Sequence, residues 1–204
     1  MKVVTTTSDD IDPILYQKAV SFVQSIVSEN PQSPAIINMG LDTSAGMLWN
    51  ITNKTRWTAK KGEISFLLSQ SDEIVGVSCV EKSTNPLLSI GGIRTWVLKP
   101  YRPKNVITNF LLESNLEYTR EHNMAGMVLT FNDYNRWIYD GIKRKTSGRA
   151  VSVGAIWSDW WNDCIVIAKP VKIRNINQWC VIKPTGLHEQ TLPDLVGGID
   201  AISE

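Results

Sequence analysis

The chain has 204 residues, of which 43% are apolar and 20% are charged, and its formal net charge is +1. These values are ordinary for a globular domain with a substantial core. A nearly neutral chain has no global field that would draw it to nucleic acid or to an anionic membrane. No apolar run approaches the ~20 residues that cross a bilayer, so we expect neither nucleic acid nor a membrane as partner.

The amino terminus and the cysteines both indicate a cytoplasmic protein. The first ten residues, MKVVTTTSDD, lack the apolar segment of a signal peptide. The three cysteines, Cys79, Cys164 and Cys180, are widely spaced in apolar or aromatic surroundings, which favours buried reduced thiols. The two histidines, His122 and His188, have no partner at ligand spacing, so we expect no metal site.

The first element expected along the chain is a helix that begins at Asp12-Pro13. An aspartate caps the free amides of a helix start, and a proline suits the first helical position. Apolar residues follow at helical spacing from Leu15 to Ile26, and Asn30-Pro31 ends the run. Residues 31–60 are polar and irregular, and so long a connection in a compact domain is usually functional.

Three strands are expected next. Residues 63–70 and 74–81 read as strands joined by the turn at 71–73, which indicates an antiparallel hairpin. A third run covers 87–98, and its Gly91-Gly92 pair indicates a bulge or a close approach of the backbone.

Helical and strand-like patterns then alternate towards the end of the chain. The expected elements are a helix from Val106 to Glu121, a strand over 124–131, a helix over 132–145 and strands over 150–157, 164–171 and 178–182. In the second of these helices, Trp137 and Ile138 are expected to face the core. A strand–helix–strand unit after antiparallel strands indicates a mixed sheet with helices on its faces.

The turn between the third strand and the following helix can bind phosphate. It reads YRPKNVITNFLL over residues 101–112. A helix start leaves backbone amides unpaired and carries partial positive charge, which suits a pyrophosphate. Arg102 and Lys104 add positive charge to the same turn. The alternative is an ordinary strand-to-helix turn with solvated basic residues.

Two segments resemble the signatures of the GNAT acyltransferases, which move acyl groups from coenzyme A to an amine. Residues 97–112, VLKPYRPKNVITNFLL, are similar to the pattern V-x-P-x-Y-R-G-x-G-[IV]-G-x-x-L-L. The residues that match this pattern at the same positions are the valine, the Tyr-Arg pair, the β-branched residue and the paired leucines. Residues 132–139, NDYNRWIY, are similar to N-x-x-A-x-x-[LI]-Y, which follows the fifth strand in that family.

The three glycine positions of the first signature hold other residues, namely Pro103, Asn105 and Ile107. Proline has no amide to donate. Asparagine tolerates a positive φ better than most residues. Ile107 places a branched side chain where members of the family let the pyrophosphate approach the backbone.

The resemblance implies an α/β (α+β mixed) fold, with a central mixed sheet of about six or seven strands flanked by helices on both faces. It implies acetyl-coenzyme A as acyl donor, with its pantetheine arm between the fourth and fifth strands. The residues implied in cofactor binding are Trp96, Val97, Arg102, Lys104, Asn105, Val106, Ile107, Thr108, Asn132 and Asn135.

The resemblance also implies that Tyr139 is the general acid that protonates the departing thiolate. A phenol of pKa ~10 can donate to a thiolate of ~8.5 with little penalty. The alternative is that Tyr139 only packs its ring on the core. Relatives often use a carboxylate on the fourth strand as base. Residues 87–98 contain none, which leaves Glu63, Glu81 and Asp133 as possible substitutes.

The resemblance divides the single domain, residues 1–204, into three parts. Residues 1–60 hold the first helix and an acceptor-side connection, 61–145 the cofactor-binding core, and 146–204 the C-terminal strands and tail. Three tryptophans, Trp157, Trp160 and Trp161, could line an acceptor pocket or a homodimer contact, although such clusters are more often core or interface.

Two functions remain open from the sequence. The first is an acyltransferase in which an unidentified amine attacks the thioester of coenzyme A directly. The second is a catalytically inactive module of the same fold that binds or assembles with another macromolecule. The replaced glycines and the missing strand carboxylate favour the second.

Replacing Ile107 with glycine tests whether the branched side chain blocks the cofactor. If it does, Ile107→Gly should bind acetyl-coenzyme A more tightly than the parent chain, because glycine lets the pyrophosphate reach the backbone. Titration calorimetry on both proteins measures the change. An unchanged affinity would mean that the turn binds in another way or does not bind.

Overall fold

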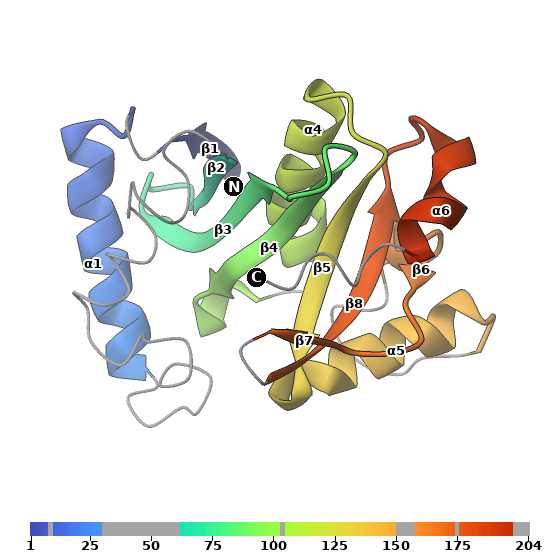
Figure 1. Ribbon diagram of the computed structural model, residues 1–204. Coiled ribbons are helices and arrows are strands. Elements are labelled where there is room, and N and C mark those ends of the chain that lie inside the picture. Colours follow the sequence, from blue (N-terminus) through green and yellow to red (C-terminus); the bar gives the residue numbers. More distant parts are fainter. Residues whose placement is uncertain (8–9, 30–61, 103–104, 150–157, 174–175, 198–204) are drawn as a thin grey trace.

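The computed structural model describes residues 1–7, 10–29, 62–102, 105–149, 158–173 and 176–197 (Figure 1). Its centre is an eight-stranded sheet in the order β1-β2-β3-β4-β5-β8-β6, with β7 also paired to β8. The connection expected over 31–60 and the strand expected over 150–157 lie outside the described residues.

The described part of the chain alternates between strands and helices. The strands are β1 (Lys2–Thr6), β2 (Gly62–Leu68), β3 (Ile74–Lys82), β4 (Leu88–Val97), β5 (Gly126–Asn132), β6 (Ile165–Val166), β7 (Val171–Ile173) and β8 (Ile176–Pro184). The α-helices are α1 (Pro13–Glu29), α4 (Glu113–Glu121), α5 (Arg136–Thr146) and α6 (Leu192–Gly197). A π-helical turn, η2 (Ile107–Leu112), leads into α4, and the short turns are η1 (Lys99–Tyr101), η3 (Asp133–Asn135), η5 (Asp159–Trp161) and η6 (Glu189–Thr191).

The sheet is mixed, and helices cover both faces, as the sequence predicts. Strands β1 to β4 are antiparallel neighbours, β4 pairs in parallel with β5, and β8 runs antiparallel to β5. On β5, Met127 and Leu129 pack in the cluster that contains α4 and α5 residues. Val128 between them packs in the cluster that contains α6 residues, because neighbouring strand residues point to opposite faces. Helix α1 covers β2 and β3.

The capping predicted for the first helix is confirmed. Asp12 Oδ1 accepts hydrogen bonds from the amides of Ile14 and Leu15, both at 2.9 Å. Within the described ranges no helix combines the length and apolar character that crossing a bilayer requires. All three cysteines are buried and free of disulfides, as expected.

Several elements differ from the sequence-based expectation. Strand β1 is an additional strand at the edge of the sheet. Its five residues, KVVTT, are too few to show a clear strand pattern in the sequence. The run expected over 164–171 is two short strands, β6 and β7, that both pair with the longer β8. Trp137 does not face the core but is 54% exposed, because Tyr139 and Ile142 occupy the buried side of α5.

The bulge predicted at Gly91-Gly92 is present and separates β4 from β5. The register between β3 and β4 shifts in this region, and Gly92 has a φ of 67°. Parallel pairing of β4 with β5 ends at Gly91, opposite Leu129. Beyond that point β5 pairs with β8 and β4 pairs with β3, and Figure 1 shows their C-terminal ends spreading apart. Two strand edges that face each other are therefore left without strand pairing.

Gly92→Ala tests how strongly the bulge depends on glycine. An added Cβ would lie 2.8 Å from Leu129 Cδ2, and the positive φ would strain any L-residue. We expect the free energy of unfolding to fall by roughly 1–3 kcal/mol, measured by urea denaturation.

Gly148→Ala is the matched control. Gly148 has a φ of 72°, but an added Cβ meets no atom within 4 Å, so only the torsional strain remains. A loss at Gly92 no larger than the loss at Gly148 would contradict a close approach of β5 to the bulge.

Candidate functional site

The turn after β4 has a glycine-like backbone at the second glycine position of the signature. Asn105 adopts a φ of 69°, in the left-handed region. Its carbonyl accepts hydrogen bonds from the Asn109 amide at 2.8 Å and from the Thr108 hydroxyl at 3.1 Å. Asparagine thus supplies here the torsion for which glycine is usually needed. Pro103 and Lys104 lie outside the described residues.

The helix start that follows is π-helical, which is unusual. A π-turn closes hydrogen bonds from residue i to i+5, and such turns are frequent at functional sites. The amides at this end, around Val106 and Ile107, have no carbonyl partners earlier in the helix. Thr108 and Val106 are buried, and Ile107 is half-buried against the core. The geometry therefore offers amide donors at the start of η2, with the Ile107 side chain partly packed inward.

Arg102 lies folded back over the end of β4. Its Nε donates to the carbonyl of Val97, and its guanidinium carbon is 5.2 Å from the centre of the Trp96 ring. The side chain is exposed, so it keeps donors free for an anion in solvent. Trp96 Nε1 is buried and has no hydrogen-bond partner among the described residues.

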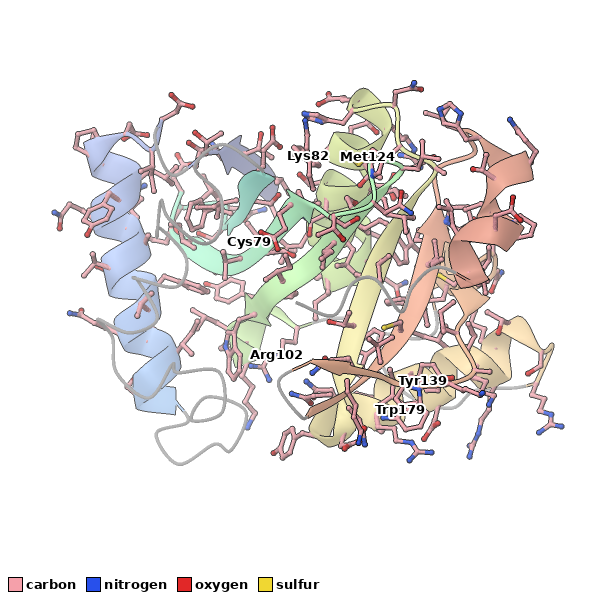
Figure 2. All side chains as sticks on the ribbon, in the orientation of Figure 1. Cys79, Lys82, Arg102, Met124, Tyr139 and Trp179 are labelled. Atoms are coloured by element: carbon pink, nitrogen blue, oxygen red, sulfur yellow. The ribbon has the colours of Figure 1, made fainter. Side chains whose placement is uncertain are left out.

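The second predicted group of residues follows β5. Asn132 Oδ1 accepts from the amide of Asn135 at 3.1 Å, so the asparagine caps the turn that starts α5. Asp133 accepts from the Trp179 indole at 2.8 Å and from the Asn177 amide at 3.2 Å. These contacts tie the start of α5 to β8. The two predicted groups thus stand on either side of the diverging ends of β4 and β5 (Figure 2).

Tyr139 is 1% exposed, and its hydroxyl donates to the carbonyl of Ile167 at 2.7 Å. Its ring centre lies 5.2 Å from that of Trp179. Burial, aided by the nearby Asp140 carboxylate, raises the pKa of the phenol above its usual range. In this structure the tyrosine is a core residue whose hydroxyl already has a hydrogen-bond partner. A role as acid requires that the hydrogen bond to the Ile167 carbonyl be broken.

The carboxylates considered as bases lie on different strands. Glu63 is on β2 and Glu81 on β3, so at least one strand separates each from the edge of β4 that faces β5. Asp133 directly follows β5 and is at the diverging end of that strand. Among the described residues no cluster of His, Cys, Asp and Glu is arranged to hold a metal ion.

Glu63 lines a groove of about 490 Å³ between the edge of the sheet and α4. Lys2, Glu113, Glu117 and Glu121 also line it. Burial raises the pKa of Glu63, the Glu121 charge raises it further, and His122 lowers it in part. This groove is separated from the β4–β5 opening by two strands, β3 and β4.

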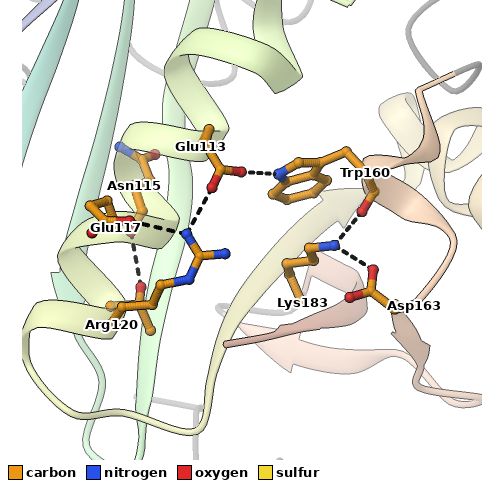
Figure 3. A network of polar contacts seen from close by, with 8 residues as sticks. Glu113, Asn115, Glu117, Arg120, Trp160, Asp163 and Lys183 are labelled. Carbon is orange, nitrogen blue, oxygen red and sulfur yellow. Dashed lines mark hydrogen bonds and ion pairs between the residues drawn. The ribbon is translucent and has the colours of Figure 1, made fainter. Parts of the chain in front are cut away.

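A polar network joins α4 to the far half of the sheet (Figure 3). Glu113 accepts from the Trp160 indole at 2.7 Å and from Arg120 at 2.8 Å. Lys183, on β8, donates to the Trp160 carbonyl at 2.5 Å, pairs with Asp163 and lies 4.8 Å from the Trp160 ring centre. The network ties α4, the helix that follows the turn after β4, to β8.

Two of the three tryptophans expected at an acceptor pocket or a dimer contact, Trp160 and Trp161, make contacts within the chain. Trp160 belongs to the network just described, and its ring packs edge-on against Trp161 at 4.7 Å. Trp161 is 3% exposed and belongs to the cluster beneath α5. Trp157 lies outside the described residues.

Asn115 is a residue that the sequence reasoning missed. It is fully buried on α4, and its Oδ1 accepts from the amide of Gly92 at 3.1 Å and from the Ser78 hydroxyl at 2.7 Å. Its Nδ2 donates to Ser65 at 3.2 Å. The available signal was that Ser65, Ser78 and Asn115 are small polar residues within two expected strands and an expected helix.

No protein-family model matches the chain, and no curated protein matches it. Solved structures do match its fold. A GNAT-family acetyltransferase from Staphylococcus aureus Mu50 is 15% identical, with a TM-score of 0.51, over 90% of this chain and 99% of that chain. An aminoglycoside 6′-N-acetyltransferase complexed with coenzyme A is 12% identical, with a TM-score of 0.53, over 89% and 97%. An aminoglycoside 6′-N-acetyltransferase from Enterococcus faecium is 13% identical, with a TM-score of 0.52, over 89% of this chain and 97% of that chain.

These similarities extend over nearly the whole of each chain at low identity. They confirm the fold implied by the two signature segments: the chain has the GNAT fold, a mixed sheet with helices on both faces.

Glu63→Gln tests the environment of the groove. Because the folded pKa of Glu63 lies above its ordinary 4.5, ionisation destabilises the folded state relative to the unfolded chain. The free energy of unfolding therefore falls as the pH rises from 4.5 through the folded pKa. The variant, which cannot ionise, should be more stable than the parent at neutral pH.

Urea denaturation at a series of pH values measures this difference. The advantage of Glu63→Gln should shrink on acidification and vanish below about pH 4.5, where both side chains are neutral. A variant less stable than the parent at neutral pH would contradict the assignment.

Proposed function

We propose that this chain is an acyltransferase that moves an acetyl or other acyl group from coenzyme A to a primary amine. The observation that carries the proposal is the end of β4–β5 pairing at Gly91 and Leu129. Beyond it, two strand edges without strand pairing face each other, and both signature segments flank them. An extended pantetheine arm carries amides of its own and can pair with such edges.

The turn after β4 is our candidate for the pyrophosphate site. The amides at the start of η2 and the partial positive charge of a helix start attract an anion. Arg102 adds a fixed charge, with its guanidinium held by the Val97 carbonyl and the Trp96 ring. The left-handed Asn105 turns the chain as glycine does in the signature. Lys104, Val106, Ile107 and Thr108 complete the proposed loop.

The reaction proposed is direct attack. The neutral amine nitrogen bonds to the thioester carbon, and the carbonyl oxygen becomes an oxyanion that backbone amides beside the bulge can stabilise. The carbon–sulfur bond then breaks, the thiolate takes up a proton, and the nitrogen loses one. The products are an amide and free coenzyme A.

Tyr139 is the proposed donor of the proton to the thiolate. A phenol is protonated at neutral pH and so is available as an acid, although burial raises the pKa of Tyr139 and makes it a weaker proton donor. For this role its hydroxyl must give up the hydrogen bond to the Ile167 carbonyl and donate to the sulfur of bound coenzyme A instead. Asp133 is our candidate to accept the proton from the amine, since it stands at the diverging end of β5.

A catalytically inactive module of the same fold is the second candidate. It is favoured by the hydrogen bond that already occupies the Tyr139 hydroxyl and by a β4 sequence without carboxylates. Such a module would bind or assemble with another macromolecule, and a homodimer is one form of it.

Calorimetric titration with acetyl-coenzyme A separates the two functions. The acyltransferase should bind about one cofactor per chain with a micromolar dissociation constant, in the range usual for enzyme substrates. Absence of binding at millimolar acetyl-coenzyme A would rule out the acyltransferase and favour the catalytically inactive module.

Tyr139→Phe is the matched variant for catalysis. It should bind acetyl-coenzyme A as the parent does, since the ring is kept, but release free thiol more slowly in the presence of primary amines. General acid catalysis typically contributes about 10²–10⁴-fold to a rate. Equal turnover would show that Tyr139 serves packing alone.

A further inference from the structure

One amide side chain joins α4 to three neighbouring strands of the sheet. Asn115 receives hydrogen bonds from Ser78 on β3 and from Gly92 on β4, and donates one to Ser65 on β2. Asn115, Ser65 and Ser78 are all 0% exposed. A buried polar group without partners is costly, and here three partners satisfy it, so the amide is fixed in one orientation.

The orientation of the amide follows from the Gly92 contact. A backbone N–H can only donate, so the side-chain atom that faces it must be the oxygen of Asn115. The nitrogen then faces Ser65, whose hydroxyl also contacts Ser114 at 3.1 Å. On the other side, Ser78 continues to Thr95 of β4 at 2.7 Å. The network therefore touches β4 both at the bulge and beyond it.

The Gly92 contact supplies a partner at the point where the strand ladder is broken. Register between β3 and β4 shifts across this region, and pairing of β4 with β5 ends at the preceding residue. A bulge leaves a residue outside the ladder, and its amide needs another acceptor when it is not in water. Asn115 Oδ1 is that acceptor at 3.1 Å.

We propose that Asn115 is the positioning residue that holds the Gly92 bulge in place and thereby sets the opening between β4 and β5. The inference rests on the proposed function in one respect, namely that coenzyme A occupies this opening. Asn115 touches neither cofactor nor acceptor in this proposal. It acts through the backbone of β4, which it fixes from the α4 side of the sheet.

The chain contains a matched control one helical turn further along α4. Thr119 is also 0% exposed, and its hydroxyl lies 2.7 Å from that of Ser89 on β4. Ser89 is in the part of β4 that still pairs with β5, opposite Met127. Thr119→Val therefore removes a buried hydrogen bond between the same helix and the same strand, away from the bulge. It also removes the bond that the Thr119 hydroxyl donates to the main-chain carbonyl of Asn115 at 2.9 Å, but it keeps the Asn115 side chain that contacts Gly92.

The first measurement concerns the bulge alone and needs no ligand. Amide hydrogen exchange, followed by NMR, reports the protection of Gly92 in the parent, Asn115→Leu and Thr119→Val. We expect Asn115→Leu to lose this protection and Thr119→Val to keep it. If Asn115→Leu does not fold, Asn115→Ala gives the same reading without added apolar bulk. Unchanged protection of Gly92 in a folded Asn115 variant would overturn the proposal.

Asn115→Asp is the conservative variant. A carboxylic side chain keeps an oxygen towards Gly92 in either protonation state, and the two serine hydroxyls can rotate to donate to it. We therefore expect Gly92 to remain protected in Asn115→Asp. Protection lost equally in Asn115→Asp and Asn115→Leu would show that the acceptor atom is not what holds the bulge.

The second measurement is the dissociation constant of acetyl-coenzyme A. It should rise about tenfold or more in Asn115→Leu, stay within about twofold in Thr119→Val, and recover in Asn115→Asp. A Gly92 amide that loses protection without any change in affinity would overturn the link to the opening. If the parent itself does not bind the cofactor, the proposed function fails, while the exchange data still decide the role of Asn115.

Discussion

The hydrogen bond from the Gly92 amide to Asn115 is the contact on which the rest of the site depends. It allows a strand in the middle of a continuous sheet to leave one neighbour while it keeps the other. Without an acceptor from α4, the amide of the half-buried Gly92 would lose the side-chain partner that it has at the break in the strand ladder. The opening between β4 and β5 thus depends on a side chain of a helix as well as on the glycine of β4.

A sheet that divides in its middle needs other connections between its two halves. Helix α4 supplies them, since it packs on β2, β3, β4 and β5 and carries Glu113 towards Trp160. Trp160 is in turn held by Lys183 on β8. Packing and hydrogen bonds of α4, on one face of the sheet, therefore hold together the two halves that diverge between β4 and β5.

The sequence predicted the elements whose pattern is local. The capped first helix, the β2–β3 hairpin and the glycine bulge each follow from neighbouring residues, and the structure confirms them. It could not show that β8 inserts between β5 and β6, because strand order depends on contacts distant in sequence. The same limit applies to the site. The hydrogen bond between Asn115 and Ser65 joins residues 50 positions apart in the sequence, and that between Tyr139 and Ile167 joins residues 28 positions apart.

Asn105 shows that a glycine position of the signature can hold another residue with a glycine-like backbone. Asn105 has a φ of 69°, a left-handed torsion that usually requires glycine. The position therefore requires a backbone angle that more than one side chain can adopt. A search by residue pattern rejects such a substitution, whereas a search by backbone torsion angle would accept it.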